Sequence, residues 1–559
     1  MEVIVIILAI IIILIIKMQH DKVSARRKLE HKLNKEWGDV PKEEFSPQKL
    51  ESMHAYYKAV KREQGDIDDI TWNDLDMNQI FYTINNTRSA AGEEVLFSML
   101  HQPEFNSETL EERERLIQYF SKNKEGRQKV QHVLSRMGKM KDLSVYEYMN
   151  RMNILKRESN LKHIMLILWL FIGIGFIFIE PLIGLSFTIF CVVNNVVKYY
   201  KRKADIEKYF QVVSYIIRLV DCARELSELK IEDISNYTQK LRTNYKNYTK
   251  FIRGSWLVTS RNPSGSLADI FLDYVRMFFH LDLMKFNTMM KVFETKNDEM
   301  NEMFEILGKL DSYIAVASFR DLMVDYCEPT LTLQKKTFIK AENIYHPMIN
   351  DPVKNSITDT KSVLITGSNA SGKSTFIKTL AINAILAQTI HTVMASRYEA
   401  SFFKVASSMA LQDNLLHKES YYIVEIKSLK RILDMLDPQI PTLCFVDEVL
   451  RGTNTLERIA ASSRILLSLA KGNALCFAAT HDIELTHILE NFYSNYHFEE
   501  KVVEDDVLFD YVLHEGRAVS KNAIKLLKIM GYDDSIIEDA TNSANQFLET
   551  GEWSKIRLE

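Results

Sequence analysis

The sequence predicts an α/β domain with a parallel sheet in its C-terminal part, preceded by a mostly α-helical region with transmembrane helices. The apolar run 362–366 is followed by a glycine-bounded loop and a helical pattern over 376–388. Beyond residue 330 apolar runs alternate with helical patterns, and upstream the apolar positions recur at three- and four-residue spacing. Long aliphatic stretches occupy residues 3–16 and 164–197.

The glycine-bounded loop has the spacing G-x-x-x-x-G-K-S of a phosphate-binding P-loop. Its residues are Gly367, Ser368, Asn369, Ala370, Ser371, Gly372, Lys373, Ser374 and Thr375. The two glycines let the backbone curl so that N–H groups point inward, and the helix N-terminus adds its positive end. Lys373 would reach the β- and γ-phosphates, and the Ser374 hydroxyl would ligate Mg²⁺. The spacing therefore predicts ATP and Mg²⁺ as cofactors; the alternative is a chance glycine-rich turn.

Two apolar runs end in polar residues, as strands of a parallel sheet do at a ligand site. Residues 442–446 lead into Asp447 and Glu448, and residues 475–479 lead into Thr480 and His481. Asp447 would complete the Mg²⁺ shell, and Glu448 would act as the general base that orients the attacking water. His481 would sense the γ-phosphate, or else serve as a structural histidine.

Composition sets the broad class. The chain has 559 residues, a net charge of -4 and five cysteines. This charge gives no global basic signal, so a nucleic-acid contact would need a local patch. The cysteines are far apart and form no C-x-x-C pair, which indicates buried thiols in a reducing compartment rather than a disulfide framework or a zinc site.

The aliphatic run over residues 3–16 is followed by basic residues, whereas a secretory signal peptide carries its positive charge before the run. We expect a membrane anchor whose C-terminal side faces the cytoplasm. The run is shorter than the ~20 residues that span a bilayer, so interfacial anchoring in a thinned membrane is an alternative. A buried strand is the other.

A second apolar block reads as a helical hairpin. Residues 164–179 and 182–197 are apolar, Glu180-Pro181 lies between them, and lysines and arginines flank both ends. Positive charge on both flanks fits two ends that face the cytoplasm. The alternatives are a buried core hairpin and a shallow re-entrant hairpin, because each arm is short. This topology puts the remainder of the chain, from residue 17 onward, on the cytoplasmic side, where ATP is.

These motifs resemble those of the MutS mismatch-repair family, whose ATPase domain is a P-loop NTPase related to ABC ATPases. The resemblance rests on Gly367–Thr375, Asp447–Thr455 and Ala479–Thr486. Ser420 and Glu425 match the family's S-x-x-x-x-E signature, with Asp413 preceding it. The resemblance implies that Ser420 completes the ATP site of a second copy, so that the protein would be a homodimer.

The resemblance extends upstream and downstream of the ATPase motifs. Residues 344–347 resemble the opening of the ATPase domain, and Val353 and Asn355 fall where the family brackets adenine. Residues 310–318 resemble the end of the family's lever helices. The mismatch-reading and connector domains have no counterpart, so direct mismatch recognition is not expected.

The predicted organisation has six parts. They are a membrane anchor (1–20), the first part of a helical core (40–160), a transmembrane hairpin (161–200), a second core and lever part (201–330), an ATPase domain (331–515) and a C-terminal helical dimerisation segment (516–559). The predicted function is a membrane-anchored ATPase whose nucleotide cycle drives dimer closure, with DNA binding linked to mismatch repair or recombination. The alternative is a motor or scaffold for a protein or lipid partner.

Overall fold

A computed structural model gives the fold of this chain. It describes residues 17, 20–21, 23–42, 45–152, 158–258, 267–293, 297–333, 336–368, 371–409, 421–451, 453–503, 506–518, 524, 527 and 530–553. The aliphatic run of the predicted anchor, residues 3–16, lies outside the described residues. The described chain forms two units, one of residues 1–61, 81–100 and 111–322, the other of residues 62–80, 101–110 and 323–559. The second unit therefore takes two short stretches from the predicted helical core, whose boundaries stay predictions.

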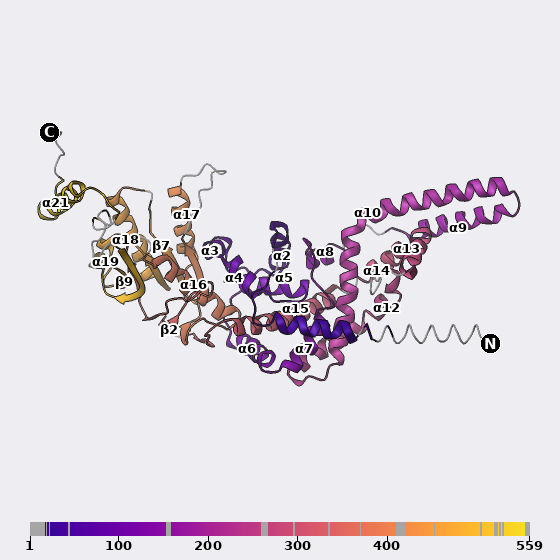
Figure 1. The fold of residues 1–559 in the computed structure, drawn as a ribbon, viewed down its shortest axis with the longest axis horizontal. Coiled ribbons are helices and arrows are strands. Elements are labelled where there is room, and N and C mark those ends of the chain that lie inside the picture. Colours follow the sequence, from indigo (N-terminus) through magenta and orange to yellow (C-terminus); the bar gives the residue numbers. More distant parts are fainter. Residues whose placement is uncertain are drawn as a thin grey trace. The chain divides into compact units, whose positions relative to one another are not determined.

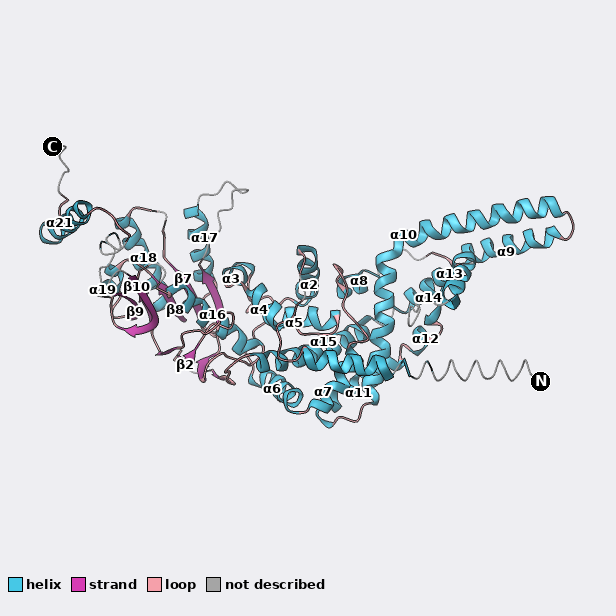
Figure 2. Ribbon diagram, viewed as in Figure 1, coloured by secondary structure: helices cyan, strands magenta, loops and turns pink. Residues whose placement is uncertain are grey.

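The described secondary-structure elements of the first unit are helices joined by loops, and the strands lie in the second unit (Figure 2). Its helices are α2 (Pro47–Val60), α5 (Ala90–His101), α7 (Lys124–Leu134), α8 (Val145–Arg151), α9 (Asn160–Ile177), α10 (Pro181–Glu228), α11 (Ser235–Lys246), α12 (Thr249–Ile252), α13 (Leu267–Phe279), α14 (Leu281–Phe293) and α15 (Asn297–Leu322), with α4 (Met77–Ile84) and α6 (Ser107–Lys122) extending into it. In α15, Met303, Leu307, Leu310 and Ile314 recur at three- and four-residue spacing and are buried. The predicted helical region ahead of the α/β domain is confirmed.

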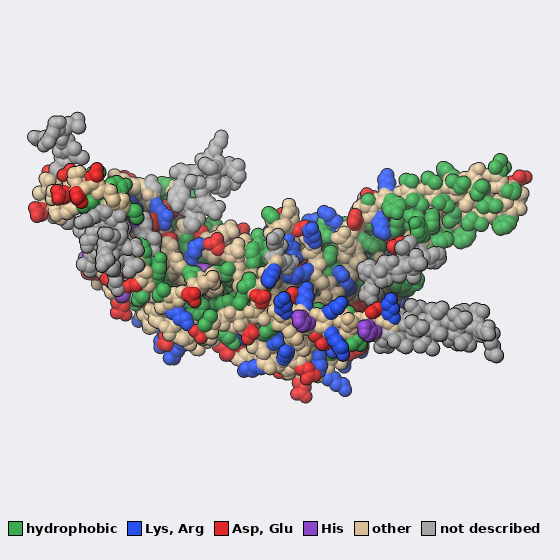
Figure 3. Space-filling view, viewed as in Figure 1, with side chains coloured by type: hydrophobic (Ala, Val, Ile, Leu, Met, Phe, Trp, Pro, Cys, Tyr) green, Lys and Arg blue, Asp and Glu red, His purple; other side chains and the backbone are tan. Residues whose placement is uncertain are grey.

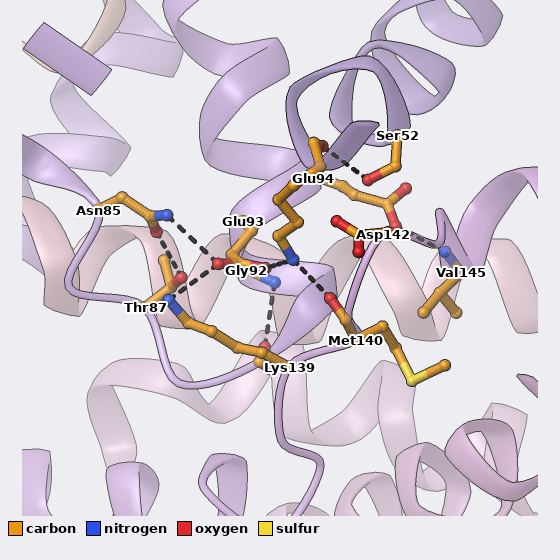
Figure 4. Close-up of polar contacts among 12 residues, drawn as sticks. Ser52, Asn85, Thr87, Gly92, Glu93, Glu94, Lys139, Met140, Asp142 and Val145 are labelled. Carbon is orange, nitrogen blue, oxygen red and sulfur yellow. Dashed lines mark hydrogen bonds and ion pairs between the residues drawn. The ribbon is translucent and has the colours of Figure 1, made fainter. Parts of the chain in front are cut away.

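Two adjacent glutamates of α5 are buried in the first unit (Figure 4). The Glu93 carboxylate lies 2.6 Å from Lys49 Nζ and 2.8 Å from Lys139 Nζ. Burial pushes the pKa of Glu93 upward, but the charges of the two lysines outweigh it and leave this pKa below its usual range. Glu94 is held instead by hydrogen bonds: its oxygens accept from Ser144 Oγ at 2.8 Å and from the Val145 N–H at 2.7 Å.

Glu94 predicts a pH dependence of stability. Burial raises the pKa of Glu94 to about 8, against an unfolded value of ~4.3. Between these values the folded chain binds a proton that the unfolded chain releases, so this group makes stability fall as pH rises. Glu94→Gln keeps both bonds, because an amide accepts from the Val145 N–H and donates to Ser144 Oγ. We expect the variant to be more stable than the parent at pH 8, and its stability to fall less steeply than the parent's as pH rises.

The measurement is the melting temperature of the full chain in detergent from pH 5 to pH 8. Glu111→Gln, at an exposed position of α6, is the matched control and should follow the parent. An unchanged pH slope in Glu94→Gln would contradict the prediction.

Helices α9 and α10 form the apolar hairpin, and they lie side by side as they extend away from the other helices of the first unit (Figure 1). Both are long and apolar enough to cross a membrane, yet only 17% and 22% of their most apolar windows are buried. Hydrophobic side chains cover the surface of the hairpin (Figure 3). Most residues of these two windows are therefore exposed in the structure.

Polar contacts attach the hairpin to the first unit at its base. His163 Nδ1 of α9 lies 2.9 Å from His280 Nδ1, and the Tyr199 hydroxyl of α10 donates to Asp282 at 2.7 Å. Helix α10 continues without a break from the apolar hairpin to Glu228. The predicted boundary at residues 200 and 201 therefore falls inside one helix, which joins the hairpin directly to the core.

The second unit contains a six-stranded sheet in the order β10-β9-β4-β8-β7-β6. Its strands are β4 (Ser362–Thr366), β6 (Lys404–Ser408), β7 (Thr442–Asp447), β8 (Ala474–Ala479), β9 (Tyr493–Val503) and β10 (Asp506–Glu515). Only the β9–β10 pair is antiparallel. All described residues of β4 and β8 are buried, as expected of strands covered on both faces. The predicted α/β domain is confirmed.

Helices and a smaller sheet complete the second unit. The helices are α3 (Asp69–Asp74), α16 (Lys373–Thr389), α17 (Tyr421–Asp434), α18 (Thr455–Lys471), α19 (Ile483–Ile488) and α21 (Asp534–Thr550). Strands β1 (Thr330–Thr332), β5 (Arg397–Ser401), β2 (Ile339–Ile344) and β3 (Asn355–Asp359) form the smaller sheet in that order. Helices α16, α17 and α18 pack on strands of the large sheet. This arrangement brings the ends of β4, β7 and β8 to one edge.

Candidate active site

The glycine-bounded loop connects β4 to α16, as the sequence predicts. Gly367 and Gly372 have φ values of 148° and 105°, which favour glycine. A Cβ on Gly367 would lie 2.9 Å from the Phe498 carbonyl oxygen, so no larger residue fits there. The Lys373 ammonium is buried and donates to the Gly367 and Ser368 carbonyl oxygens at 2.9 and 2.7 Å. The loop is thus closed around a cation, at the N-terminus of a helix whose dipole favours anions.

Burial lowers the pKa of Lys373, and the nearby carboxylates of Glu448 and Asp447 oppose this shift. Of the other loop residues, Ser374 and Thr375 are exposed and Ser371 is buried. Asn369 and Ala370 lie outside the described residues.

The predicted acids stand at the end of β7, next to β8. Glu448 Oε1 lies 2.8 Å from His481 Nε2, and Glu448 Oε2 lies 2.6 Å from Arg451 Nε. The Glu448 backbone N–H donates to the Ala479 carbonyl oxygen at 3.0 Å, which fixes this residue to the end of β8. The structure therefore brings Glu448 and His481 into direct contact, whereas the sequence only placed them on separate strands. Arg451 was not among the predicted site residues.

A second arginine holds the loop that carries His481. Arg458 of α18 pairs with both oxygens of Asp482, at 2.9 and 2.6 Å. The Thr480 backbone N–H donates to the Ile365 carbonyl oxygen of β4 at 3.0 Å. These contacts tie His481 to both the β4 end and α18, so its ring is positioned from two sides.

The residues predicted to bind Mg²⁺ suit that ion. Mg²⁺ prefers oxygen ligands and keeps several waters, so one or two protein ligands plus phosphates are enough. Asp447 Oδ1 is buried and has no hydrogen-bond partner among the described residues, a cost that a cation would remove. Ser374 is the second residue of α16 and is exposed. Within the described ranges no group of three or more His, Cys, Asp or Glu residues could hold a metal by itself.

A cavity of about 260 Å³ adjoins the loop. Its lining includes Val353 and Asn355, the two predicted adenine contacts, with Gly372 and Thr375 from the loop and helix α16. Aromatic rings contribute much of the rest: Tyr345, His346, Phe376, Phe498 and Tyr511. Flat rings around a small cavity beside a phosphate loop suit a purine base, which offers faces for stacking.

Asn355 also has a structural role beside its predicted adenine contact, which stays a prediction. Its amide donates to the Tyr511 carbonyl oxygen at 3.0 Å and accepts from the Leu513 N–H at 2.7 Å. The β9–β10 register shifts between Phe509 and Leu513, and Tyr511 has a φ of 54°. Asn355 therefore holds a bulge that carries Tyr511 to the cavity. No spacing in the sequence links residues 156 positions apart, which is why Tyr511 was missed.

Burial lowers the pKa of His346 to about 4, so its ring is neutral at physiological pH. A neutral imidazole can stack on a base, and it carries no positive charge that would repel a nearby cation. The signature residues Ser420 and Asp413 lie outside the described residues, and the trans role of Ser420 stays a prediction.

Comparisons with known proteins agree with this geometry. Residues 363–548 match the family model MutS domain V. The chain is 27% identical to DNA mismatch repair protein MutS of Natronomonas pharaonis over 277 residues, which cover 46% of this chain and 31% of that protein. It is 25% identical to MutS protein homolog 4 of Homo sapiens over 409 residues, which cover 64% of this chain and 43% of that protein.

The chain is also 26% identical to DNA mismatch repair protein MSH3 of Vanderwaltozyma polyspora over 374 residues, which cover 59% of this chain and 36% of that protein. It thus spans less than half the length of each of these curated relatives. A P-loop, an Asp-Glu pair and a neighbouring histidine stand together at one sheet edge inside the matched region. The C-terminal part of this chain is therefore a MutS domain V, an ATPase domain, and the chain is a distant homologue of the MutS proteins.

Proposed function

We propose that this chain is a membrane-anchored MutS-like ATPase in which ATP binding closes two copies together and hydrolysis separates them. The observation that carries this proposal is the grouping of Lys373, Asp447 and Glu448 at neighbouring strand ends beside an aromatic cavity. Adenine occupies the cavity, and the triphosphate lies along the loop that begins α16.

Catalysis in this site is positioning and electrostatics. Lys373 supplies a buried positive charge to the β- and γ-phosphates. Glu448 accepts a proton from the attacking water, and His481, 2.8 Å from it, contacts the γ-phosphate side of the site. Ser374 and Asp447 would hold Mg²⁺, which would supply positive charge that neutralises the phosphates. Arg451 pairs with Glu448, so the carboxylate is oriented before substrate arrives.

The membrane part of the proposal is supported by the α9–α10 hairpin. Its side chains are apolar and exposed, and two such helices with positive flanks suit a bilayer better than water. Because α10 is one helix that runs from the hairpin into the helical core, with a sharp bend where the two meet (Figure 1), it would carry motion in the core to the hairpin. Nucleotide-driven movement would therefore reach the membrane.

DNA is the first candidate for the partner. Relatives of this chain are named for DNA mismatch repair, and the segment 122–141 of the first unit, which contains α7, carries the exposed lysines Lys122, Lys124 and Lys129. Phosphate contacts release counterions, so DNA binding would weaken steeply with salt. We expect the full chain in nanodiscs to bind duplex DNA with a log–log salt slope steeper than about -3 and without preference for a mismatch.

The test is fluorescence anisotropy with duplex, mismatched and branched DNA across salt, alongside the ATPase rate. Lys129→Glu changes the charge inside the segment and should weaken DNA binding. Lys230→Glu makes the same change outside the segment, so it is the matched control and should bind DNA as the parent does. Indifference of both binding and ATPase rate to all three DNAs would contradict a DNA partner. That result would favour the second candidate, a motor or scaffold for a protein or lipid partner, which the exposed hairpin supports.

A further inference from the structure

The turn that follows β7 has an unusual backbone. Glu448 and Leu450 have φ values of 53° and 60°, in the left-handed region that non-glycine residues rarely occupy. Residues held in such conformations persist only when their surroundings over-determine them, and they gather at functional sites. The Glu448 N–H is held by the Ala479 carbonyl oxygen of β8. Leu450 needs a separate restraint.

Helix α17 supplies that restraint through Glu425. Its Oε1 accepts a short hydrogen bond from the Leu450 N–H. Both side chains are buried, and Leu450 packs in the core cluster with Val449 and Leu429, the latter also on α17. Glu425 Oε2 is buried and has no hydrogen-bond partner among the described residues, while the carboxylate also interacts with the Arg451 backbone N–H, so it is held inside the domain for contacts with this turn alone. A carboxylate that held the turn from the solvent side would avoid the free-energy cost of burying an oxygen without a hydrogen-bond partner.

The restrained turn determines where the catalytic groups stand. Glu448 begins it and Arg451 follows Leu450, and these two side chains form an ion pair at 2.6 Å. Releasing Leu450 to an ordinary negative φ would rotate the peptide that leads into Arg451. The pair would then lose its geometry, and with it the orientation of the Glu448 carboxylate. A displacement of about 1 Å in a reacting group is enough to cost ~100-fold in rate.

We propose that Glu425 is a positioning residue for ATP hydrolysis, which fastens helix α17 to the strained turn presenting Glu448. The inference rests on the proposed role of Glu448 as general base. Glu425 touches no nucleotide; it sets the conformation of the turn through Leu450. A shift of α17 along the sheet therefore withdraws or delivers the base, so that α17 controls the hydrolysis step separately from nucleotide binding.

The experiment measures kcat and KM for ATP on the full chain in nanodiscs. Glu425→Ala is expected to lower kcat by about 10- to 100-fold, with KM for ATP changed less than about twofold. Glu425→Gln should stay within about threefold of the parent, because its amide oxygen still accepts from the Leu450 N–H. Lys430→Ala, an exposed position of the same helix, is the matched control and should behave as the parent.

A double-mutant cycle with Leu450→Gly tests the positioning role; because this variant also removes a buried side chain from the core cluster, its own kcat is the reference for the double variant. Glycine occupies a left-handed φ without strain, so the turn no longer needs the carboxylate. Glu425→Ala should then have little further effect on kcat in the Leu450→Gly background. Melting temperatures of all variants show whether each folds; if Glu425→Ala does not, Glu425→Asp, one methylene too short to reach, replaces it.

An unchanged kcat in Glu425→Ala, or an equal loss in both backgrounds, would overturn the inference while leaving the proposed function intact. Failure of the parent to hydrolyse ATP, or full activity in Glu448→Gln, would instead overturn the proposed function. A loss in Glu425→Gln equal to that in Glu425→Ala would also overturn the inference, because charge rather than the hydrogen bond would then be responsible.

Discussion

Glu448→Gln should leave ATP bound and lower kcat by about 10²- to 10⁴-fold, the range for removing a general base. The amide keeps the shape of the side chain and a contact with Arg451 or His481, but it cannot accept a proton from water. The affinity for ATP should stay within about threefold, because Lys373 and the loop carry the phosphate contacts. Single-turnover hydrolysis and equilibrium binding of a fluorescent ATP analogue measure the two effects.

Glu484→Gln, on α19 close in sequence to His481, is the control and should retain the parent kcat. Loss of nucleotide binding in Glu448→Gln, with its melting temperature unchanged, would argue against a role confined to the hydrolysis step. Retained kcat would remove Glu448 from the mechanism.

Two glutamates in the middle of α9 should release the hairpin from the bilayer. Leu168 and Ile172 are exposed in the structure, so Leu168→Glu with Ile172→Glu leaves the described packing nearly intact. A charged residue at the centre of a membrane helix costs about 2.5 to 3.5 kcal/mol on insertion scales. The test is flotation with lipid vesicles, using a chain that lacks residues 1–16 so that the hairpin alone holds the protein to the membrane.

The parent of this series should float and the double variant should remain in the soluble or aggregated fraction. Leu161→Glu, exposed at the start of α9, is the matched control and should float, because a charge near the end of a span reaches the interface. Equal flotation of the double variant and its parent would contradict a bilayer-spanning hairpin.

The sequence predicted the parts of the site that depend on local pattern. A glycine-bounded loop between a strand and a helix is written in nine consecutive residues, and Asp447-Glu448 marks the end of an apolar run. Parallel strands bring such ends to one edge, so the meeting of β4, β7 and β8 follows from their order in the fold. The helices of the first unit were likewise predicted from apolar positions that recur at three- and four-residue spacing.

What the sequence did not predict depends on contacts between distant residues. The Asn355 amide holds the β10 bulge at Tyr511, and the Glu425 carboxylate holds the turn at Leu450. Neither pair has a characteristic spacing in the sequence, and no local sequence pattern predicts a leucine with a positive φ. The assignment of residues 62–80 and 101–110 to the second unit also depends on contacts between distant residues. Arg431 pairs with Asp68, and Ser407 bonds to Asp74, over more than 300 positions.

The proposed function requires that this site take up adenine nucleotide with magnesium and that the bound nucleotide join two copies of the chain. The most direct measurement is the mass of the full-length Glu448→Gln variant in detergent, with ATP and Mg²⁺ and then with Mg²⁺ alone, together with the nucleotide retained per chain. We predict one nucleotide per chain and a dimer with ATP, and monomers without it. No retained nucleotide at millimolar ATP and Mg²⁺ would contradict the proposed function.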